Sequence, residues 1–140
     1  MSESKLSGTR SSGAALQVAL AYYDAWTHKD VEKTMSYVAK DIVCDAPGGR
    51  IEGTAQFRKF WADFLQMLTG SHLVAAYGDD ATALILYDSE TIPVKHAPVA
   101  EYVTVENGKI AYSRMVFDRT PFANLQGRPQ ARQTAAQSQS

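Results

Sequence analysis

This sequence has little cysteine, almost no excess of one charge over the other and no long apolar run, and each of these features excludes a class of protein. Cys44 is the single cysteine among 140 residues, so neither an intrachain disulfide nor a cysteine-based zinc site can form. The 14 Lys and Arg residues nearly balance the 15 Asp and Glu residues, so the chain has no general attraction to nucleic acid or to an anionic membrane. Since no run of about 18 apolar residues occurs, we expect no membrane span.

Several motifs of known chemistry are also missing. The sequence contains neither a Gly-x-Ser-x-Gly elbow nor a phosphate-binding Gly-rich loop. Its three histidines are too far apart to suggest a zinc-binding helix. Basic residues are interspersed with acidic ones, so nucleic acid is not an expected partner. We therefore expect neither a metal nor an organic cofactor.

The two ends of the chain differ in composition from its middle. Residues 1–12 are rich in Ser and contain no apolar run, so we expect a flexible N-terminus that is neither a signal peptide nor an anchor. Residues 126–140 are mostly Gln, Ala, Ser and Arg, a composition typical of disorder. We therefore expect one domain over residues 13–125 and a cytoplasmic location.

The first half of the chain predicts three helices. Apolar residues three and four positions apart predict an amphipathic helix over residues 13–28 and a clearer one over 54–68, ended by Gly70. Asp30 is a suitable N-cap for a short helix between them. A short strand is expected over residues 42–46, where β-branched residues precede a turn.

The second half predicts strands. They are expected over residues 72–77, 81–87, 94–106 and 109–117. Pro98 indicates a bulge or an edge position, and Asn107-Gly108 predicts a tight hairpin between the last two strands. Helices followed by strands predict an α+β fold with the helices on one face of a bent sheet, an arrangement that leaves a cavity between the two layers.

A series of short motifs also follows a characteristic order and spacing. They are residues 22–26, 29–30, 41–43, 47–49, 51, 53 and 57–64 in the first half, and 100–105, 107–110 and 114–122 in the second. Together they resemble the SnoaL-like domains of the nuclear transport factor two-like superfamily. The resemblance implies a cone-shaped, curved antiparallel sheet packed against three N-terminal helices around an apolar pocket, and a homodimer that pairs through the sheet. The fold hosts isomerases, dehydratases, cyclases, epoxide hydrolases and plain binding modules.

The ketosteroid isomerases, one branch of this superfamily, use a carboxylate base beside an oxyanion hole formed by a tyrosine and a protonated acid. The resemblance places Tyr22 at the tyrosine and Glu101 at the protonated acid. The base falls on Ala46, and Asp45 is one residue early, on the opposite face of a strand unless a bulge intervenes. The Asp–Arg–Asp set of the limonene-type epoxide hydrolases is missing, since its last aspartate falls on Met115.

Glu101 is the sharpest candidate for chemistry. It alternates with Val103 and Val105, which should face the core, so its carboxyl group is expected in the cavity with a raised pKa. The alternative is the reversed phase, in which Glu101 faces solvent beside Tyr102. For Tyr22, a role in packing is the alternative to a role as a hydrogen-bond donor.

The remaining candidates each have two interpretations. Asp45 is either a base or a residue that stabilises the turn at 47–48 through backbone hydrogen bonds. Arg114, Asp118 and Arg119 are expected to form a surface or interface ion network. Six large side chains either line a ligand pocket or belong to an ordinary core: Trp26, Trp61, Phe64, Tyr87, Met115 and Phe117.

These observations leave the function open. One hypothesis is a cofactor-independent isomerase, dehydratase or cyclase that acts by proton transfer on a hydrophobic small molecule. In it Glu101 is the acid or oxyanion donor, Tyr22 a hydrogen-bond donor and Asp45 the base. The alternative is a non-catalytic module for small-molecule binding or dimerisation, which the missing base at Ala46 favours. A third is an accessory subunit whose sheet face docks another protein.

Overall fold

The computed structural model describes residues 13–122. The expected flexible N-terminus (1–12) and the expected disordered tail (126–140) lie outside the described residues. The elements in chain order are α1 (Ala14–Thr27), α2 (Val31–Met35), β1 (Val38–Ala46), β2 (Gly49–Glu52), α3 (Gly53–Met67), β3 (Leu68–Gly78), β4 (Thr82–Thr91), β5 (Ala97–Glu106) and β6 (Lys109–Val116).

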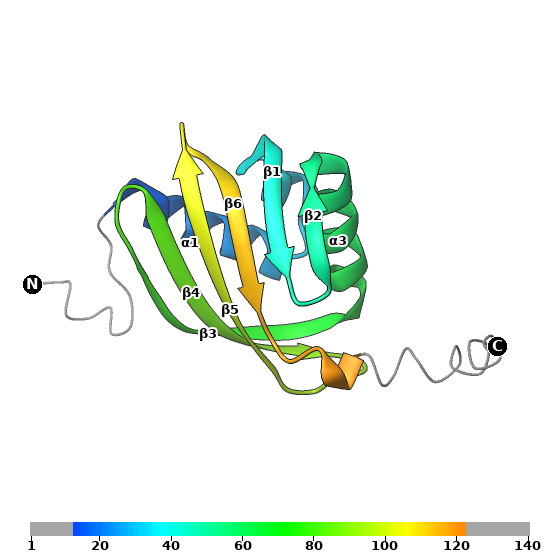
Figure 1. Cartoon of the computed structure of the whole chain (residues 1–140). Helices are drawn as coiled ribbons and strands as arrows, with labels where there is room; N and C mark the ends of the chain where they lie inside the picture. The colour runs from blue at the N-terminus through cyan, green and yellow to red at the C-terminus, as the bar shows by residue number, and fades with distance from the viewer. Residues whose placement is uncertain (1–12, 123–140) are drawn as a thin grey trace, which may run out of the picture.

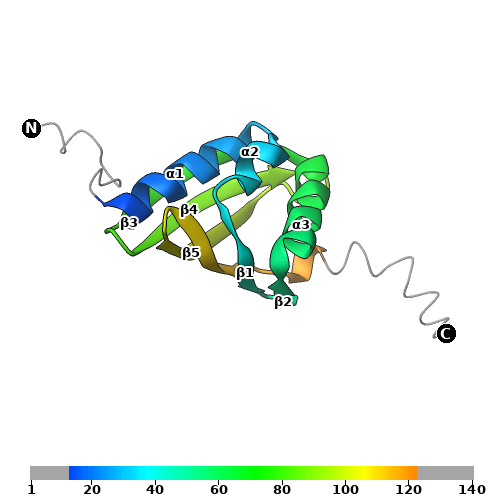
Figure 2. The ribbon, with the colours of Figure 1, turned by 90° about the horizontal axis from the view of Figure 1, so that it is seen from above.

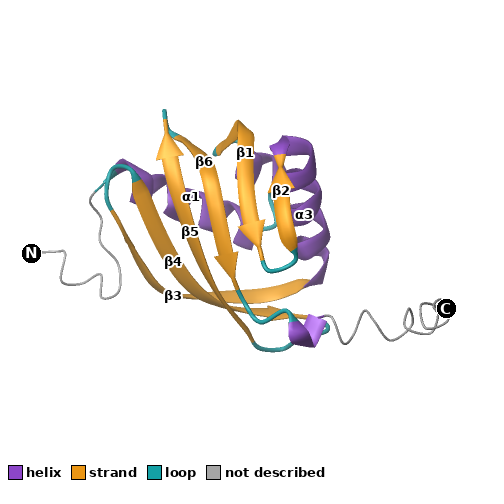
Figure 3. Ribbon diagram, in the orientation of Figure 1, coloured by secondary structure: helices purple, strands orange, loops and turns teal. Residues whose placement is uncertain are grey.

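The strands of residues 13–122 form one curved six-stranded sheet in the order β2-β1-β6-β5-β4-β3 (Figure 1). The pairs between neighbours are antiparallel except that of β1 with β6, which is parallel. The predicted α+β fold with a curved sheet is confirmed, and the pair of β1 with β6 is the one departure from the predicted antiparallel arrangement among the described strands. The reason is topological, because β1 lies beside β6, the last strand of the described residues, as well as beside its own hairpin partner. The sheet is open, with β2 and β3 as its edges (Figure 3).

The helices pack against one face of this sheet, as the view from above shows (Figure 2). The stripe of buried side chains along α1 has the three-and-four spacing expected of an amphipathic helix. Its large members are Leu16, Tyr22, Tyr23 and Trp26. On β4 and β5 every second residue is buried, which is the period of a strand with one face against a core. The core therefore lies between α1, α3 and the concave face of the sheet.

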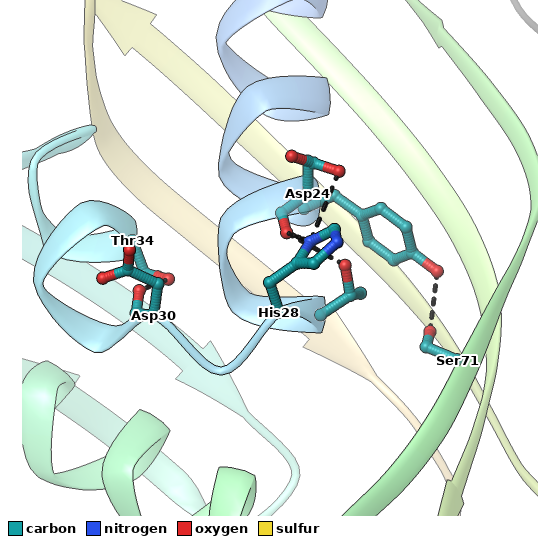
Figure 4. A network of polar contacts seen from close by, with 7 residues as sticks. Asp24, His28, Asp30, Thr34 and Ser71 are labelled. Atoms are coloured by element: carbon teal, nitrogen blue, oxygen red, sulfur yellow. Dashed lines mark hydrogen bonds and ion pairs between the residues drawn. The ribbon is translucent and has the colours of Figure 1, made fainter.

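Local hydrogen bonds fix the end of α1 and the start of α2. The Asp30 carboxylate accepts a bond from the backbone N–H of Lys33 at 3.0 Å, so the predicted N-cap is confirmed. Nearby, the Thr34 hydroxyl donates to the Asp30 carbonyl at 2.7 Å. The ring Nδ1 of His28 lies 2.7 Å from the Asp24 carbonyl oxygen and closes the last turn of α1 (Figure 4).

The middle of the chain differs from the sequence prediction in two ways. Gly70 does not end α3, because the helix ends at Met67 and passes directly into β3. Leu68 is already extended (φ −69°, ψ 128°) and 2% exposed, so pairing and burial of this residue end the helix. The strand β2 was not expected. Its four residues are too few to show a period.

The backbone of the second half of the chain has the conformations that its turn residues and Pro98 favour. Asn107 and Gly108 have φ values of 53° and 75°, as a hairpin turn with two left-handed residues requires, so the predicted hairpin is confirmed. Pro98 pairs with Asp88 of β4 without a bulge. The pairing of β5 with β6 begins at Ala100, so Pro98 occupies an edge position on that side.

Candidate functional site

The centre of the candidate site is the carboxyl group of Glu101, which has an exposed fraction of 0%. Three hydroxyl groups donate to it. Those of Tyr22 and Ser113 each lie 2.8 Å from Oε2, and that of Tyr87 lies 3.4 Å from Oε1. A buried acid thus has hydrogen-bond partners for both of its oxygens, as a polar group away from water requires.

Elements far apart in the sequence bring these groups together. Glu101 lies on β5, between Ile85 of β4 and Met115 of β6. Its neighbours at alternate positions on β5 are buried, so its side chain points to the concave face, and the inward phase expected from the alternation is the one observed. Tyr22 comes from the buried stripe of α1, which packs across that face.

Burial sets the protonation of this cluster. It raises the pKa of Glu101 to about 7, although the hydrogen bonds from the three hydroxyls oppose the effect. The pKa values of Tyr22 and Tyr87 are raised well above the ordinary value, first by burial and then by the charge of Glu101. Both tyrosines therefore stay protonated and remain donors, while Glu101 exchanges its proton near neutral pH.

Cys44 is part of the same buried cluster. It is 0% exposed and pairs with Ser113 in the parallel register of β1 and β6. Burial, with the charge of Glu101, raises its pKa to about 12. Because the reactive form of cysteine is the thiolate, the group is an inert thiol at neutral pH.

A cavity of about 420 Å³ lies between α3 and the sheet, near the β1–β2 turn. Its wall is mainly apolar and aromatic. The aromatic members are Phe60, Trp61, Phe64, Tyr87, Phe117 and Phe122. The aliphatic members are Ala46, Ile51, Met67, Ala97, Val99 and Met115. Charged side chains of Arg50, Asp63 and Arg119 also lie on it, and these residues are exposed, so they mark its mouth.

The cavity wall includes neither Glu101 nor Tyr22. Tyr87 connects the two regions, because it lines the cavity and its hydroxyl group bonds to Glu101. Met115, directly opposite Glu101 on β6, is a second wall residue at the boundary. The acid therefore lies behind the wall of the cavity rather than in it.

The six large side chains considered as pocket residues divide between wall and core. Five of them line the cavity: Trp61, Phe64, Tyr87, Met115 and Phe117. Trp26 does not. It is 0% exposed and stacks on Trp61 with ring centroids 4.8 Å apart, so it supports the wall from behind. Within residues 13–122 the indole N–H groups of both tryptophans are buried without a hydrogen-bond partner.

Asp45 is directed away from the cluster. Arg50 donates to both of its oxygens, at 2.8 and 3.0 Å, and the hydroxyl of Tyr112 donates at 2.7 Å. These bonds hold the pKa of Asp45 down at about 2. A carboxylate engaged in this way is a poor proton acceptor. Its partners are the side chains of the β1–β2 hairpin and β6, rather than the turn N–H groups considered from the sequence.

Sequence reasoning missed Ser113 and the bond from Tyr87 to Glu101. Ser113 carried one signal, because it is a polar residue two positions before Met115 on a strand and therefore shares its inward phase. In the part of the chain that the structure describes, no three His, Cys, Asp or Glu side chains are grouped so as to hold a metal ion. Nor is any helix of residues 13–122 long and apolar enough to cross a bilayer.

A curved sheet with helices on its concave face is the architecture of the nuclear transport factor two-like proteins. The family model of the SnoaL-like domain matches residues 19–113, and the chain belongs to this family. A solved structure from Kribbella flavida is 51% identical over 81% of this chain and 93% of that one, with a TM-score of 0.78.

More distant structures share the fold. One is described as a putative polyketide cyclase from Sinorhizobium meliloti, at 19% identity and a TM-score of 0.65, over 71% of this chain and 94% of that one. Another is an NTF2-like protein of unknown function from Cytophaga hutchinsonii, at 14% identity and a TM-score of 0.67, over 75% and 90% of the two chains. None of the curated proteins that were compared matches the sequence.

Proposed function

We propose that the protein binds a hydrophobic small molecule in the cavity between α3 and the sheet. The observation that carries the proposal is the mainly apolar wall around a cavity of about 420 Å³. Cavities that hold small-molecule ligands are typically about 300–1,000 Å³, with mostly apolar walls and few polar groups. An apolar ligand in this space removes its own surface and that of the wall from water, and this burial favours binding.

The test is binding of a neutral fluorescent probe, N-phenyl-1-naphthylamine, before and after the cavity is filled. Ala97 lines the cavity, so Ala97→Leu should place additional methyl groups in it and weaken probe binding at least tenfold. Ala55→Leu, on the exposed surface of α3, is the matched control and should bind as the wild type does. Equal binding by both variants, or no binding by the wild type, would contradict the proposal.

A second candidate function is proton transfer to or from the bound molecule. It is supported by one observation, the buried Glu101 with a pKa of about 7 beside the hydroxyls of Tyr22 and Tyr87. A general acid or base works best when its pKa is near the working pH. Because Glu101 lies behind the cavity wall, its proton would reach the bound molecule through the hydroxyl of Tyr87, which bonds to Glu101 and belongs to a wall residue. In this scheme Glu101 acts without Asp45, whose carboxylate is bound to Arg50.

Hydrogen–deuterium exchange at the carbon next to a ketone distinguishes proton transfer from binding alone. We expect the protein to accelerate exchange in 1-tetralone, followed by NMR at neutral pH, and Glu101→Gln to abolish the acceleration while probe binding persists. A wild-type protein that binds the ketone without accelerating exchange would restrict the function to binding.

We also propose that two copies of the chain pair through the outer face of the sheet. On this face Tyr77, Leu84 and Tyr102 lie side by side on β3, β4 and β5. Leu86 of β4 and Val116 of β6 flank Ala100 in the next row. These five large side chains are 38–61% exposed. An apolar surface of this kind can pair with a second copy of itself about a two-fold axis.

The pairing is tested by sedimentation of the wild type and of Leu86→Lys at micromolar concentration. We expect a dimer for the wild type and a folded monomer for the variant. A monomeric wild type would contradict the pairing.

A further inference from the structure

The charged groups at the mouth of the cavity differ in whether they have a partner. Arg50 is bound to Asp45, with Nε 2.8 Å from Oδ1. Asp63 is bound to Lys59, with Nζ 3.1 Å from Oδ2. Arg119 has neither an ion pair nor a hydrogen bond to any side chain of residues 13–122. The ion network expected from the sequence around Arg119 is therefore not formed within this part of the chain.

The position of Arg119 is set by the segment after β6. This segment also supplies Phe117 and Phe122 to the cavity wall, so two apolar wall residues flank Arg119 in the sequence. A side-chain carbon at Gly48 would lie 3.4 Å from Nε and 3.8 Å from Nη2 of Arg119, so the guanidinium lies over the β1–β2 turn. The adjacent acid, Asp118, accepts a bond from the backbone N–H of Thr120 at 3.0 Å.

We propose that the ligand of this cavity is an amphipathic anion, with an apolar body inside the cavity and a carboxylate at the mouth that pairs with Arg119. This inference rests on the proposed binding function and defines its ligand class. A guanidinium is always charged and matches the two oxygens of a carboxylate with two parallel N–H donors. Since Arg50 already binds a carboxylate, Arg119 is the cation available to the ligand.

The balance of charge at the mouth also favours a head group with a single negative charge. One unpaired cation neutralises one charge, and the carboxylate of Asp63 lies on the same rim. A doubly charged group such as a phosphate monoester would keep one uncompensated charge, because the other charged groups on the rim, Arg50 and Asp63, already have partners. The aromatic wall suits a flat ring system as the apolar body, because its rings can contact the faces or edges of the ligand.

The test compares naphthalene-2-carboxylate with naphthalene-2-carboxamide, which share their ring system and differ in charge. Binding is measured by titration calorimetry with the wild type, Arg119→Gln and the control Arg114→Gln. The control removes the same charge from an exposed side chain of β6 that is not part of the cavity wall. An exposed ion pair with bidentate geometry predicts that the wild type binds the carboxylate roughly five- to tenfold tighter than the amide.

We expect Arg119→Gln to bind both compounds equally, at the wild-type affinity for the amide, and Arg114→Gln to keep the preference for the carboxylate. Raising the salt concentration should weaken the binding of the carboxylate alone. Equal binding of the two compounds to the wild type, or the same loss in both variants, would overturn the carboxylate assignment and leave the cavity proposal intact. Failure of both compounds to bind would instead overturn the cavity proposal.

Discussion

Replacement of Glu101 by Gln tests the physical basis of the site most directly. The side chain has an exposed fraction of 0%, and burial raises its pKa from 4.5 to about 7. A carboxamide has nearly the same shape and carries no charge at any pH in this range. The variant therefore removes the ionisation and keeps the volume.

The raised pKa makes stability depend on pH in a defined window. Below pH 4.5 the acid is protonated in both the folded and the unfolded chain, and its contribution to stability is fully present. Between 4.5 and about 7 the unfolded chain releases the proton while the folded one keeps it, so the free energy of unfolding falls. At about 1.4 kcal/mol per pH unit, the loss is about 3 kcal/mol, and it is complete above the folded-state pKa.

The assay is urea unfolding followed by tryptophan fluorescence between pH 4.5 and 8.5. We expect the wild type to lose about 3 kcal/mol across this window relative to Glu101→Gln, whose curve lacks the contribution. The ionisation of Asp45, with a pKa of about 2 against an ordinary 3.8, falls below this window. Parallel curves for the two proteins would show that Glu101 ionises normally and would refute the account of the site.

Three further predictions concern side chains in and around the cluster and the cavity. Tyr22→Phe should raise the pKa of Glu101 further, because the hydrogen bond that it removes lowers that pKa. The pH-dependent fall in the free energy of unfolding should therefore end at a higher pH, and an unchanged midpoint of that fall would argue against the contact. Trp61→Ala should reduce the free energy of unfolding by about 3–5 kcal/mol in urea, and a loss below about 1 kcal/mol would be inconsistent with its packing. Asp45→Asn should lack the stability that the wild type loses as the pH falls from 3.8 towards 2, measured by circular dichroism. This variant should bind the neutral probe N-phenyl-1-naphthylamine as the wild type does, and weaker binding of the probe would place Asp45 in the site.

Local pattern was enough to predict the long helices and to divide β5 into two faces, of which the structure buries the one with Glu101. The α3 stripe has apolar residues at the helical period, and Phe57, Trp61 and Leu65 are the ones buried. On β5 the alternation places Glu101 on the same face as Val99 and Val103. In both cases the side chains of one segment divide it into two faces, so a single sequence contains the information.

The partners of Glu101 could not be derived in this way. Tyr22 lies 79 positions away, on a helix whose placement over the sheet depends on the whole core. The parallel pairing of β1 with β6 is equally non-local. The position of Asp45 was open for a different reason, because whether its strand contains a bulge is not visible in residue types. Its bidentate bond to Arg50 requires the β1–β2 hairpin, whose second strand is too short to predict.

The direct passage of α3 into β3 has a consequence for how a ligand enters and leaves. Met67 is helical and Leu68 already belongs to the sheet, so no linker between α3 and β3 can act as a hinge for outward movement of the helix. We therefore expect exchange to proceed past the β1–β2 turn and the segment that carries Arg119, while the helical wall stays fixed. Access to the cavity would then depend on Arg119, the same residue that is proposed to bind the carboxylate.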